Sequence, residues 1–154
     1  MRDVDQEICA TKVYEAVKSG YRLIYTSNLS ENEIHVGTGI QRAIDDGICT
    51  RKDLFVVSKF QSDSANVDAE DIREAAEKSL QDLNLHYIDA YLLEIIEEVN
   101  YLDSWKEMES LVESDLVRNI GLSGTSTDML CHVLAHAVVK PSLLMLEIHE
   151  DDSV

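Results

Sequence analysis

The chain has 154 residues, of which 45% are hydrophobic and 28% are charged, a composition typical of one globular domain rather than of a disordered segment. Thirty acidic residues against 13 basic ones give a formal net charge of −17. The phosphates of nucleic acids and of anionic membranes repel such a chain, so we exclude both as partners. Because the sequence shows neither an apolar run of membrane-spanning length nor a basic and apolar leader, we expect a cytoplasmic protein.

Cysteine and histidine spacing gives no metal site. Cys9, Cys49 and Cys131 lie far apart in the sequence, and we expect reduced thiols that are mostly buried. His132 and His136 are one helical turn apart, a spacing that suits metal ligands. They lack the intervening glutamate of the zincin pattern and a third ligand nearby, so the sequence predicts no bound metal.

Segments with helical spacing of their apolar residues alternate with short apolar runs along the chain. In chain order we expect a helix at Asp5–Ser19, a strand at Tyr21–Thr26, a helix at Ser30–Asp46, a strand at Leu54–Lys59, a helix at Asp68–Leu83, a strand at Tyr87–Leu93, a helix at Ser104–Ser114, a strand at Leu116–Leu122, a helix at Thr127–Val138 and a strand at Pro141–Ile148. This alternation predicts an α/β fold with parallel strands buried under crossover helices. Spacing alone does not separate an open doubly wound sheet from part of a barrel.

Two local patterns have structural interpretations. Asp68 followed three residues later by Asp71 predicts a capping box at the start of a helix. Gly37–Thr38–Gly39 lies inside a predicted helix and follows no strand, so it is not a dinucleotide-binding fingerprint. We expect these small residues to let the helix pack closely on the sheet.

Runs of residues along nearly the whole chain follow the motifs of one protein family in collinear order. Gly20–Thr26 followed by Asn32–Glu33 resembles the aldo-keto reductase segment G-Y-R-x-I-D-T-A-x-x-Y-x-N-E. The other matching positions are Val36–Gly37, Ile40, Arg42–Ile44, Gly47, Arg51–Lys59, Ser79–Leu80, Leu83, Leu85, Tyr87–Asp89, Tyr91–Leu92, Trp105–Glu109, Leu116–Ser123, Lys140–Pro141 and Glu147–His149.

The resemblance implies a (β/α)₈ barrel that binds a nicotinamide cofactor at the carboxyl ends of its strands. The chain aligns with the family's first helix through its sixth strand. We therefore expect residues 1–154 to form a single incomplete domain, a partial (β/α) TIM-type barrel of about five parallel strands alternating with helices. Five strands cannot close an eight-stranded barrel, so we expect a protein partner or self-association through the open barrel edges.

The resemblance also locates a catalytic tetrad. The family reduces a carbonyl with a tyrosine acid whose pKa is tuned by a lysine that an aspartate holds, while a histidine orients the carbonyl. Carried over by position, the aspartate falls on Tyr25 and the tyrosine falls on Ser30. The lysine falls on Lys59, the only retained member, and the histidine falls on Glu94. An alkyl hydroxyl at Ser30 is too weakly acidic to act as that acid, and an anionic Glu94 would repel a developing oxyanion.

Few of the family's cofactor contacts are retained. Its serine–asparagine pair after the fifth strand appears as Ser123–Gly124, and its asparagine–glutamine pair in the sixth strand falls on Leu144–Met145. Ser123 is thus the one candidate for a cofactor contact. We expect no cofactor, or NADPH if the chain is a reductase after all.

We interpret the chain as an aldo-keto reductase-like protein without catalytic activity, acting as a binding or regulatory module. One alternative is a divergent NADPH-dependent reductase of aldehydes or ketones, with Tyr25 beside Lys59 as a relocated acid. Another is a truncated product without function. Under the first interpretation Lys59 is a structural cation, and we expect its side chain to meet that of Glu94 from the adjacent strand. Asp89 and Trp105 are expected to have structural roles.

Overall fold

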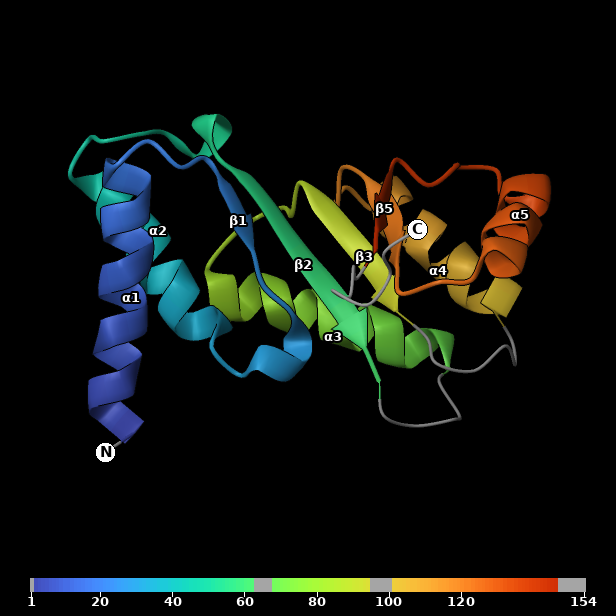
Figure 1. The fold of residues 1–154 in the computed structure, drawn as a ribbon, viewed down its shortest axis with the longest axis horizontal. Helices are drawn as coiled ribbons and strands as arrows, with labels where there is room; N and C mark the ends of the chain where they lie inside the picture. Colours follow the sequence, from blue (N-terminus) through green and yellow to red (C-terminus); the bar gives the residue numbers. More distant parts are fainter. Residues whose placement is uncertain (1, 63–67, 95–100, 147–154) are drawn as a thin grey trace, which may run out of the picture.

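The computed structural model describes residues 2–62, 68–94 and 101–146 of the chain, and in them the predicted alternation of helices and strands is confirmed (Figure 1). In chain order the elements are α1 (Arg2–Lys18), β1 (Leu23–Tyr25), the 3₁₀ turn η1 (Asn28–Ser30), α2 (Glu33–Asp45), the 3₁₀ turn η2 (Arg51–Asp53), β2 (Phe55–Gln61), α3 (Ala69–Leu83), β3 (Ala90–Glu94), α4 (Tyr101–Glu113), β4 (Ile120–Ser123), α5 (Thr127–His136) and β5 (Leu143–Met145). Their ends differ from the predicted ends by a few residues. The last predicted strand extends into residues 147 and 148, which lie outside the described residues.

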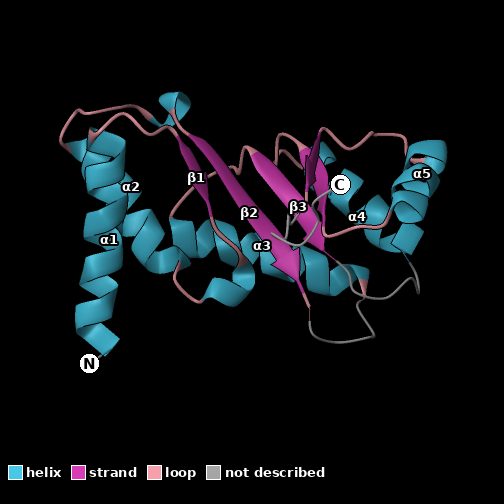
Figure 2. Ribbon diagram, in the orientation of Figure 1, coloured by secondary structure: helices cyan, strands magenta, loops and turns pink. Residues whose placement is uncertain are grey.

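The five strands form one parallel sheet in the order β1-β2-β3-β4-β5. Each crossover therefore steps to the next strand in the same direction, and since such crossovers are right-handed, every helix is placed on the same face of the sheet. Figures 1 and 2 show the helices in an arc from α1 to α5 around this face. The sheet is a curled half-barrel, so the expected partial (β/α) TIM-type barrel is confirmed and the doubly wound alternative is excluded.

The two faces of the sheet have separate apolar clusters. On the helix-covered face, strand residues pack in the main core with Trp105 and Met108 of α4, which are 1% and 0% exposed. On the inner face Val57, Ala90 and Leu92 form a smaller cluster with partly buried neighbours that include Leu143 and Met145 of β5. Trp105 also donates its indole N–H to the carbonyl of Val139 at 3.1 Å, in agreement with its expected structural role.

Asp89 connects three strands at their amino ends. Its Oδ2 accepts a hydrogen bond from the Val56 N–H at 2.9 Å and forms an ion pair with Arg51 at 2.7 Å. Its carbonyl accepts from the side-chain amide of Asn119 at 2.9 Å. Because Asp89 is 6% exposed and its carboxylate bonds are charge-assisted, it stabilises the packing of β2, β3 and the start of β4. The expected structural role of Asp89 is confirmed.

Three local expectations have different outcomes. The capping box of α3 is confirmed, since the Asp68 N–H donates to Asp71 Oδ2 at 2.9 Å. The predicted start of the second helix at Ser30 is wrong: Ser30 ends η1, and α2 begins only at Glu33, because Glu31 adopts a left-handed backbone with φ 49°. The expectation of mostly buried cysteines is also wrong, since only Cys49 is buried while Cys131 is exposed on α5.

The glycines of α2 serve helix packing rather than sheet packing. A Cβ atom on Gly37 would lie 2.5 Å from the carbonyl oxygen of Leu83 at the end of α3. A Cβ on Gly39 would lie 2.5 Å from the carbonyl oxygen of Ala10 in α1. The expected close approach is real, but its partners are the neighbouring helices, so the helix-to-sheet prediction is wrong.

Within the described ranges, no helix is long and apolar enough to cross a membrane. The same residues contain no group of three or more histidine, cysteine, aspartate or glutamate side chains that could hold a metal ion. His132 and His136 lie with their ring centroids 4.5 Å apart on the exposed side of α5.

Gly37→Ala is expected to lower the free energy of unfolding by about 1–2 kcal/mol. Alanine favours a helix over glycine by about 1 kcal/mol, but the new methyl group would overlap the backbone of Leu83, which cannot move aside without shifting α3. Urea titration followed by circular dichroism measures the difference. Thr38→Ala, at the exposed neighbouring position in α2, is the control and should not destabilise the chain. Equal stability of Gly37→Ala and the parent would contradict the close helix contact.

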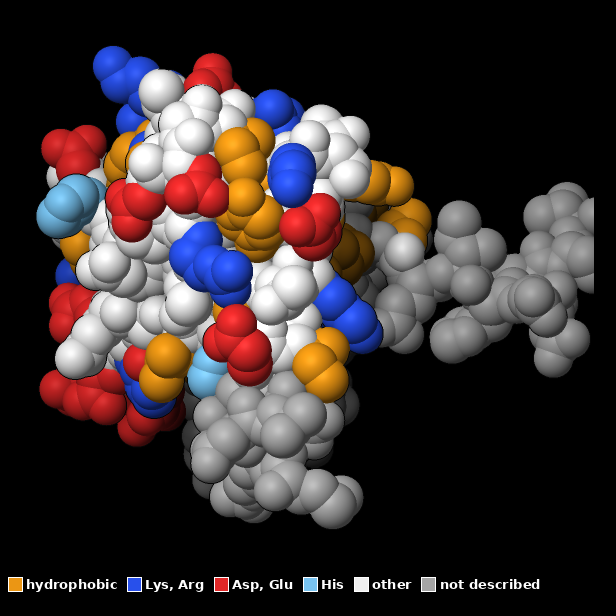
Figure 3. Space-filling view, turned by 90° about the vertical axis from the view of Figure 1, so that its left-hand side faces the viewer, with side chains coloured by type: hydrophobic (Ala, Val, Ile, Leu, Met, Phe, Trp, Pro, Cys, Tyr) orange, Lys and Arg blue, Asp and Glu red, His pale blue; other side chains and the backbone are white. Residues whose placement is uncertain are grey.

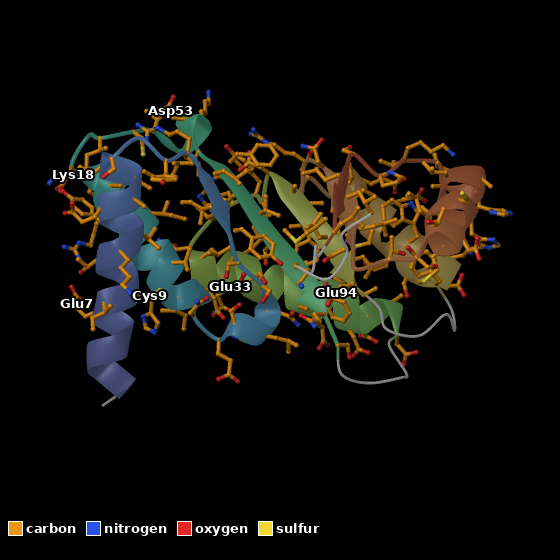
Figure 4. All side chains as sticks on the ribbon, in the orientation of Figure 1. Glu7, Cys9, Lys18, Glu33, Asp53 and Glu94 are labelled. Atoms are coloured by element: carbon orange, nitrogen blue, oxygen red, sulfur yellow. The ribbon has the colours of Figure 1, made fainter. Side chains whose placement is uncertain are left out.

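Glu33 lies 5% exposed at the start of α2, where its Oε1 accepts a hydrogen bond from Ser58 Oγ at 2.8 Å (Figure 4). Burial raises the pKa of this carboxyl above its ordinary value of 4.5, outweighing the hydroxyl hydrogen bonds. Because its folded-state pKa is raised, Glu33 destabilises the folded chain when it is ionised. The contribution of Glu33 to stability is therefore most favourable in acid, and it is lost as the pH rises from 4.5 through the folded-state pKa.

Glu33→Gln should therefore raise the melting temperature at pH 7, and this gain should shrink as the pH falls from the folded-state pKa towards the ordinary value of 4.5, below which it should be absent. Calorimetry of both proteins at several pH values measures it. Glu31→Gln, at an exposed position two residues earlier, is the control. A gain of the same size at every pH would show that burial of the charge is not its cause.

Candidate functional site at the carboxyl ends of the strands

The inner face of the half-barrel carries an ion pair between Lys59 of β2 and Glu94 of β3. Lys59 Nζ lies 2.7 Å from Glu94 Oε2, and the two side chains are 9% and 15% exposed. In the sheet register Lys59 is opposite Leu92, while Glu94 is opposite Gln61, so the pair crosses the strands diagonally. Figure 4 shows Glu94 at the carboxyl end of β3. The predicted meeting of these two side chains is confirmed.

Ser123 is the third member of this cluster. Its Oγ donates a hydrogen bond to the same Oε2 of Glu94 at 2.6 Å, and the residue is only 3% exposed. Gly124 follows with φ 58°, and a Cβ there would be 3.6 Å from the Glu94 carboxylate. Ser123 thus orients Glu94. Sequence reasoning missed this contact, although the end of β4 beside the end of β3 could have indicated it.

Mutual stabilisation of the two charges outweighs the cost of burying them. Burial alone would lower the pKa of Lys59, but the hydrogen bond and charge of Glu94, with a contribution from Tyr25, raise this pKa above its ordinary value. Burial alone would raise the pKa of Glu94, but the hydrogen bonds from Lys59 and Ser123 and the charge of Lys59 lower it. Lys59 is therefore held as an ammonium and Glu94 as a carboxylate at neutral pH.

Tyr25 and Ser30 occupy the remaining two tetrad positions. Tyr25 ends β1, 43% exposed, and its phenol is close enough to Lys59 to contribute to the raised pKa of that lysine. Ser30 is exposed at the end of η1, where its N–H donates to the carbonyl of Ser27 and its hydroxyl lies 2.7 Å from Ser27 Oγ. The structure therefore brings together Tyr25, Lys59, Glu94 and Ser123, while the hydrogen bonds of Ser30 stay within its own turn.

A second contact that sequence reasoning missed fixes this turn against the sheet. The side-chain amide of Asn28 donates to the carbonyl of Gln61 at 3.1 Å and its Oδ1 accepts from the Gln61 N–H at 3.0 Å. The Asn28 side chain thus bonds to both backbone groups of Gln61, the last residue of β2, at a point beyond the end of the neighbouring strand β1. No feature of the local sequence around Asn28 signals this partner 33 residues away.

The positions that face a cofactor in the resembling family carry unsuitable groups here. Ser123 uses its hydroxyl on Glu94, and Gly124 has no side chain to hold a carboxamide. In β5, Leu144 points outward and is 42% exposed, while Met145 packs against the inner-face cluster. The described residues of this edge therefore do not fit a nicotinamide.

Comparison with known proteins agrees with the fold. The family model "Aldo/keto reductase family" matches residues 3–149. A probable NAD(P)H-dependent D-xylose reductase of Emericella nidulans is 34% identical over 95% of this chain and 53% of its own length. The NAD(P)H-dependent D-xylose reductase of Pachysolen tannophilus is 37% identical over 93% of this chain and 52% of its own length.

Solved structures give the same result. An aldo-keto reductase of Bombyx mori in complex with NADP superimposes with a TM-score of 0.85 at 30% identity, covering 93% of this chain and 48% of that one. The aldose reductase of Schistosoma japonicum gives a TM-score of 0.83 at 31% identity, with 93% and 53% coverage. The fold is part of an aldo-keto reductase barrel. This chain belongs to the aldo/keto reductase family, and it spans about half the length of the relatives it matches.

Loss of either member of the Lys59–Glu94 pair should lower the free energy of unfolding by about 1–3 kcal/mol, more than the 0.2–1 kcal/mol typical of an exposed pair, because the remaining charge would be left partly buried. A double-mutant cycle with Lys59→Met and Glu94→Gln measures the coupling energy, and the same cycle on the exposed pair Lys106–Asp103 is the control.

The pair should also make stability depend on pH. Since the pKa of Glu94 is lowered by folding, the contribution of Glu94 to stability should be present above the ordinary glutamate pKa and be lost as the pH falls through the folded-state pKa. Additive effects of Lys59→Met and Glu94→Gln would contradict this pairing.

Proposed function

We propose that this member of the aldo/keto reductase family has no reductase activity and acts as a binding or regulatory module, with residues 1–154 as one incomplete barrel domain. The observation that carries the proposal is the 2.7 Å contact between Lys59 Nζ and Glu94 Oε2. An ammonium paired with a carboxylate loses most of the field by which it could lower the pKa of a nearby phenol. The retained lysine is then a structural cation.

Ser30 and Glu94 support the same proposal. A general acid must lie within hydrogen-bond reach of the substrate oxygen and must have a pKa near the working pH. Ser30 has an alkyl hydroxyl whose contacts are with Ser27. Glu94 places a negative charge at the rim, where the family's reaction develops a negative oxygen, and this charge opposes the reaction.

The proposed function includes no binding of a nicotinamide cofactor. The Bombyx mori relative was solved with NADP, and the fungal relatives are named as NAD(P)H-dependent. In this chain Ser123, Gly124, Leu144 and Met145 offer no side-chain amide to hold a carboxamide. The three cysteines are free, which supports a reducing compartment such as the cytoplasm.

One observation favours a divergent NADPH-dependent carbonyl reductase as the second candidate. Tyr25 is near Lys59, so a phenol and an ammonium still adjoin at the rim, although the phenol comes from the position of the family's aspartate. Such a dyad would let Tyr25 donate the proton to a substrate oxygen. It would require Lys59 to release Glu94.

Reductase activity separates the two candidates. Purified protein mixed with NADPH and either D-xylose or an aromatic aldehyde should show no saturable loss of absorbance at the NADPH wavelength, and calorimetric titration should detect no NADPH binding. The Pachysolen tannophilus xylose reductase, assayed in parallel, is the positive control. A saturable rate that Tyr25→Phe and Lys59→Met both abolish would establish the reductase instead. Glu94→Gln distinguishes the cases further, since freeing Lys59 should raise the rate of a Tyr25 reductase.

A third candidate, a truncated product without function, makes a different prediction. A chain without a selected structure should unfold gradually and bind a hydrophobic dye such as ANS. The proposed module should instead unfold in one cooperative transition. Calorimetry of the parent protein supplies this readout without any assumption about the rim.

A further inference from the structure

The outer edge of β1 has unpaired backbone groups. The Arg22 carbonyl accepts from Phe55 and the Thr26 N–H donates to Val57, so these residues and Ile24 face β2. Successive residues of a parallel strand alternate in direction, and therefore the N–H and C=O groups of Leu23 and Tyr25 point away from the sheet. Both side chains are exposed, at 64% and 43%. An open parallel edge of this kind pairs readily with another strand.

An apolar groove of about 240 Å³ lies directly beside this edge. It runs between one side of α1 and the start of β1, and it is lined by Lys12, Val13, Ala16, Val17, Tyr21, Leu23 and Ile24. Figure 3 views this side of the molecule, where hydrophobic side chains lie in small groups between charged ones. An added strand on β1 would place one outward side chain in the groove.

The order of the elements fixes the direction of that strand. In a βαβ repeat each helix covers the junction between the strand before it and the strand after it. Helix α1 precedes β1, and within the described residues no strand of this sheet lies before it. Helix α1 therefore already covers a place for a strand that runs parallel to β1.

The opposite edge of the same sheet carries a matching strand. In β5, Ser142 donates to the Ile120 carbonyl, so the alternation points the N–H and C=O of Leu143 to the free edge. Leu144 points to the helix side, where it is 42% exposed. Leu134 of α5 and Val138 just beyond it are 44% and 87% exposed near this edge. The β5 edge thus presents an uncovered leucine, and the β1 edge presents an apolar groove.

We propose that β5 of a second copy of this chain pairs in parallel with β1, and that its Leu144 fills the groove beside α1. In this arrangement α1 of one copy covers β5 of the other and lies next to its α5, so that Leu134 and Val138 are also covered. The second copy is chosen as the partner because its β5 carries the complementary edge, with Leu144 exposed beside it. The inference concerns the sheet edges and stands whether or not the rim reduces carbonyls.

The same contact used twice closes a two-fold ring. Two five-stranded sheets then form a ten-stranded parallel barrel with two β5–β1 junctions and no remaining edge. A ten-stranded barrel turns about 36° per strand instead of about 45° in an eight-stranded one.

Net charge opposes the contact in a measurable way. Each copy has a formal charge of −17, so two copies repel one another at low ionic strength. The dimer should therefore become tighter as NaCl is added, unlike an association based on salt bridges. Sedimentation equilibrium of the full 154-residue chain at low and high NaCl should give twice the 17.3 kDa mass of one chain, with a dissociation constant that falls with salt.

Cross-linking tests which edges meet. In a Cys9→Ser, Cys131→Ser background, the pair Ala16→Cys and Leu144→Cys on one chain should give a disulfide-linked dimer on a non-reducing gel. Ala16 lies on α1 beside β1, and Leu144 lies on β5 at the opposite edge of the five-stranded sheet. Their separation exceeds the roughly 7 Å between Cα atoms that a disulfide can bridge, so the bond cannot form within one chain. Neither single substitution should cross-link.

Leu144→Glu supplies the second test. It would put a charge into the groove of the partner, and because Leu144 is exposed in the single chain, the fold of that chain should not be disturbed. It should weaken the dimer at least tenfold, whereas Ile34→Glu, at a similarly exposed position on α2, should leave it unchanged. A monomer in the parent chain at high salt would overturn the proposal. Cross-linking by Ala16→Cys alone would also overturn it, because it would indicate a contact between two α1–β1 edges. An unaltered dimer in Leu144→Glu would overturn it as well.

Discussion

The structure depends on one geometric constraint, a parallel ladder in which every crossover steps to the next strand in the same direction. This constraint puts all the helices on one face and gathers the carboxyl ends of the strands along one rim. It also leaves an inner face to be filled by Val57, Ala90 and Leu92. The rim chemistry and the two open edges are both consequences of this winding.

At the rim, Lys59, Glu94 and Ser123 form one cluster of paired charges and hydrogen bonds. Where the resemblance implies an aspartate for Lys59, the chain has Tyr25, and where it implies a histidine, the chain has Glu94. The structure shows that these changes belong together: Glu94 supplies the anion for Lys59 that Tyr25 does not, and Ser123 holds that anion in place. The buried polar groups are thereby satisfied, and the site is stabilised without needing a ligand.

At the edges, the same winding leaves complementary unpaired features on opposite sides of one sheet. The groove beside α1 and the exposed Leu144 of β5 both follow from a barrel that the described residues do not close. Assembly and rim chemistry are separate properties of the chain, because they involve different residues on different parts of the sheet.

The sequence by itself determined the alternation of elements, the family, the partial barrel and the pairing of Lys59 with Glu94. These features could be predicted because the periodic spacing of apolar residues, helix caps and collinear motifs are local signals. The carboxyl ends of adjacent parallel strands also meet at one edge of a sheet. Only the tertiary structure decided that Ser123 bonds to Glu94, that Ser30 stays within its own turn, and that Gly37 faces α3 instead of the sheet. Each of these depends on which segments distant in the chain become neighbours and on where individual side chains point, and neither is encoded in the spacing of residues along one segment.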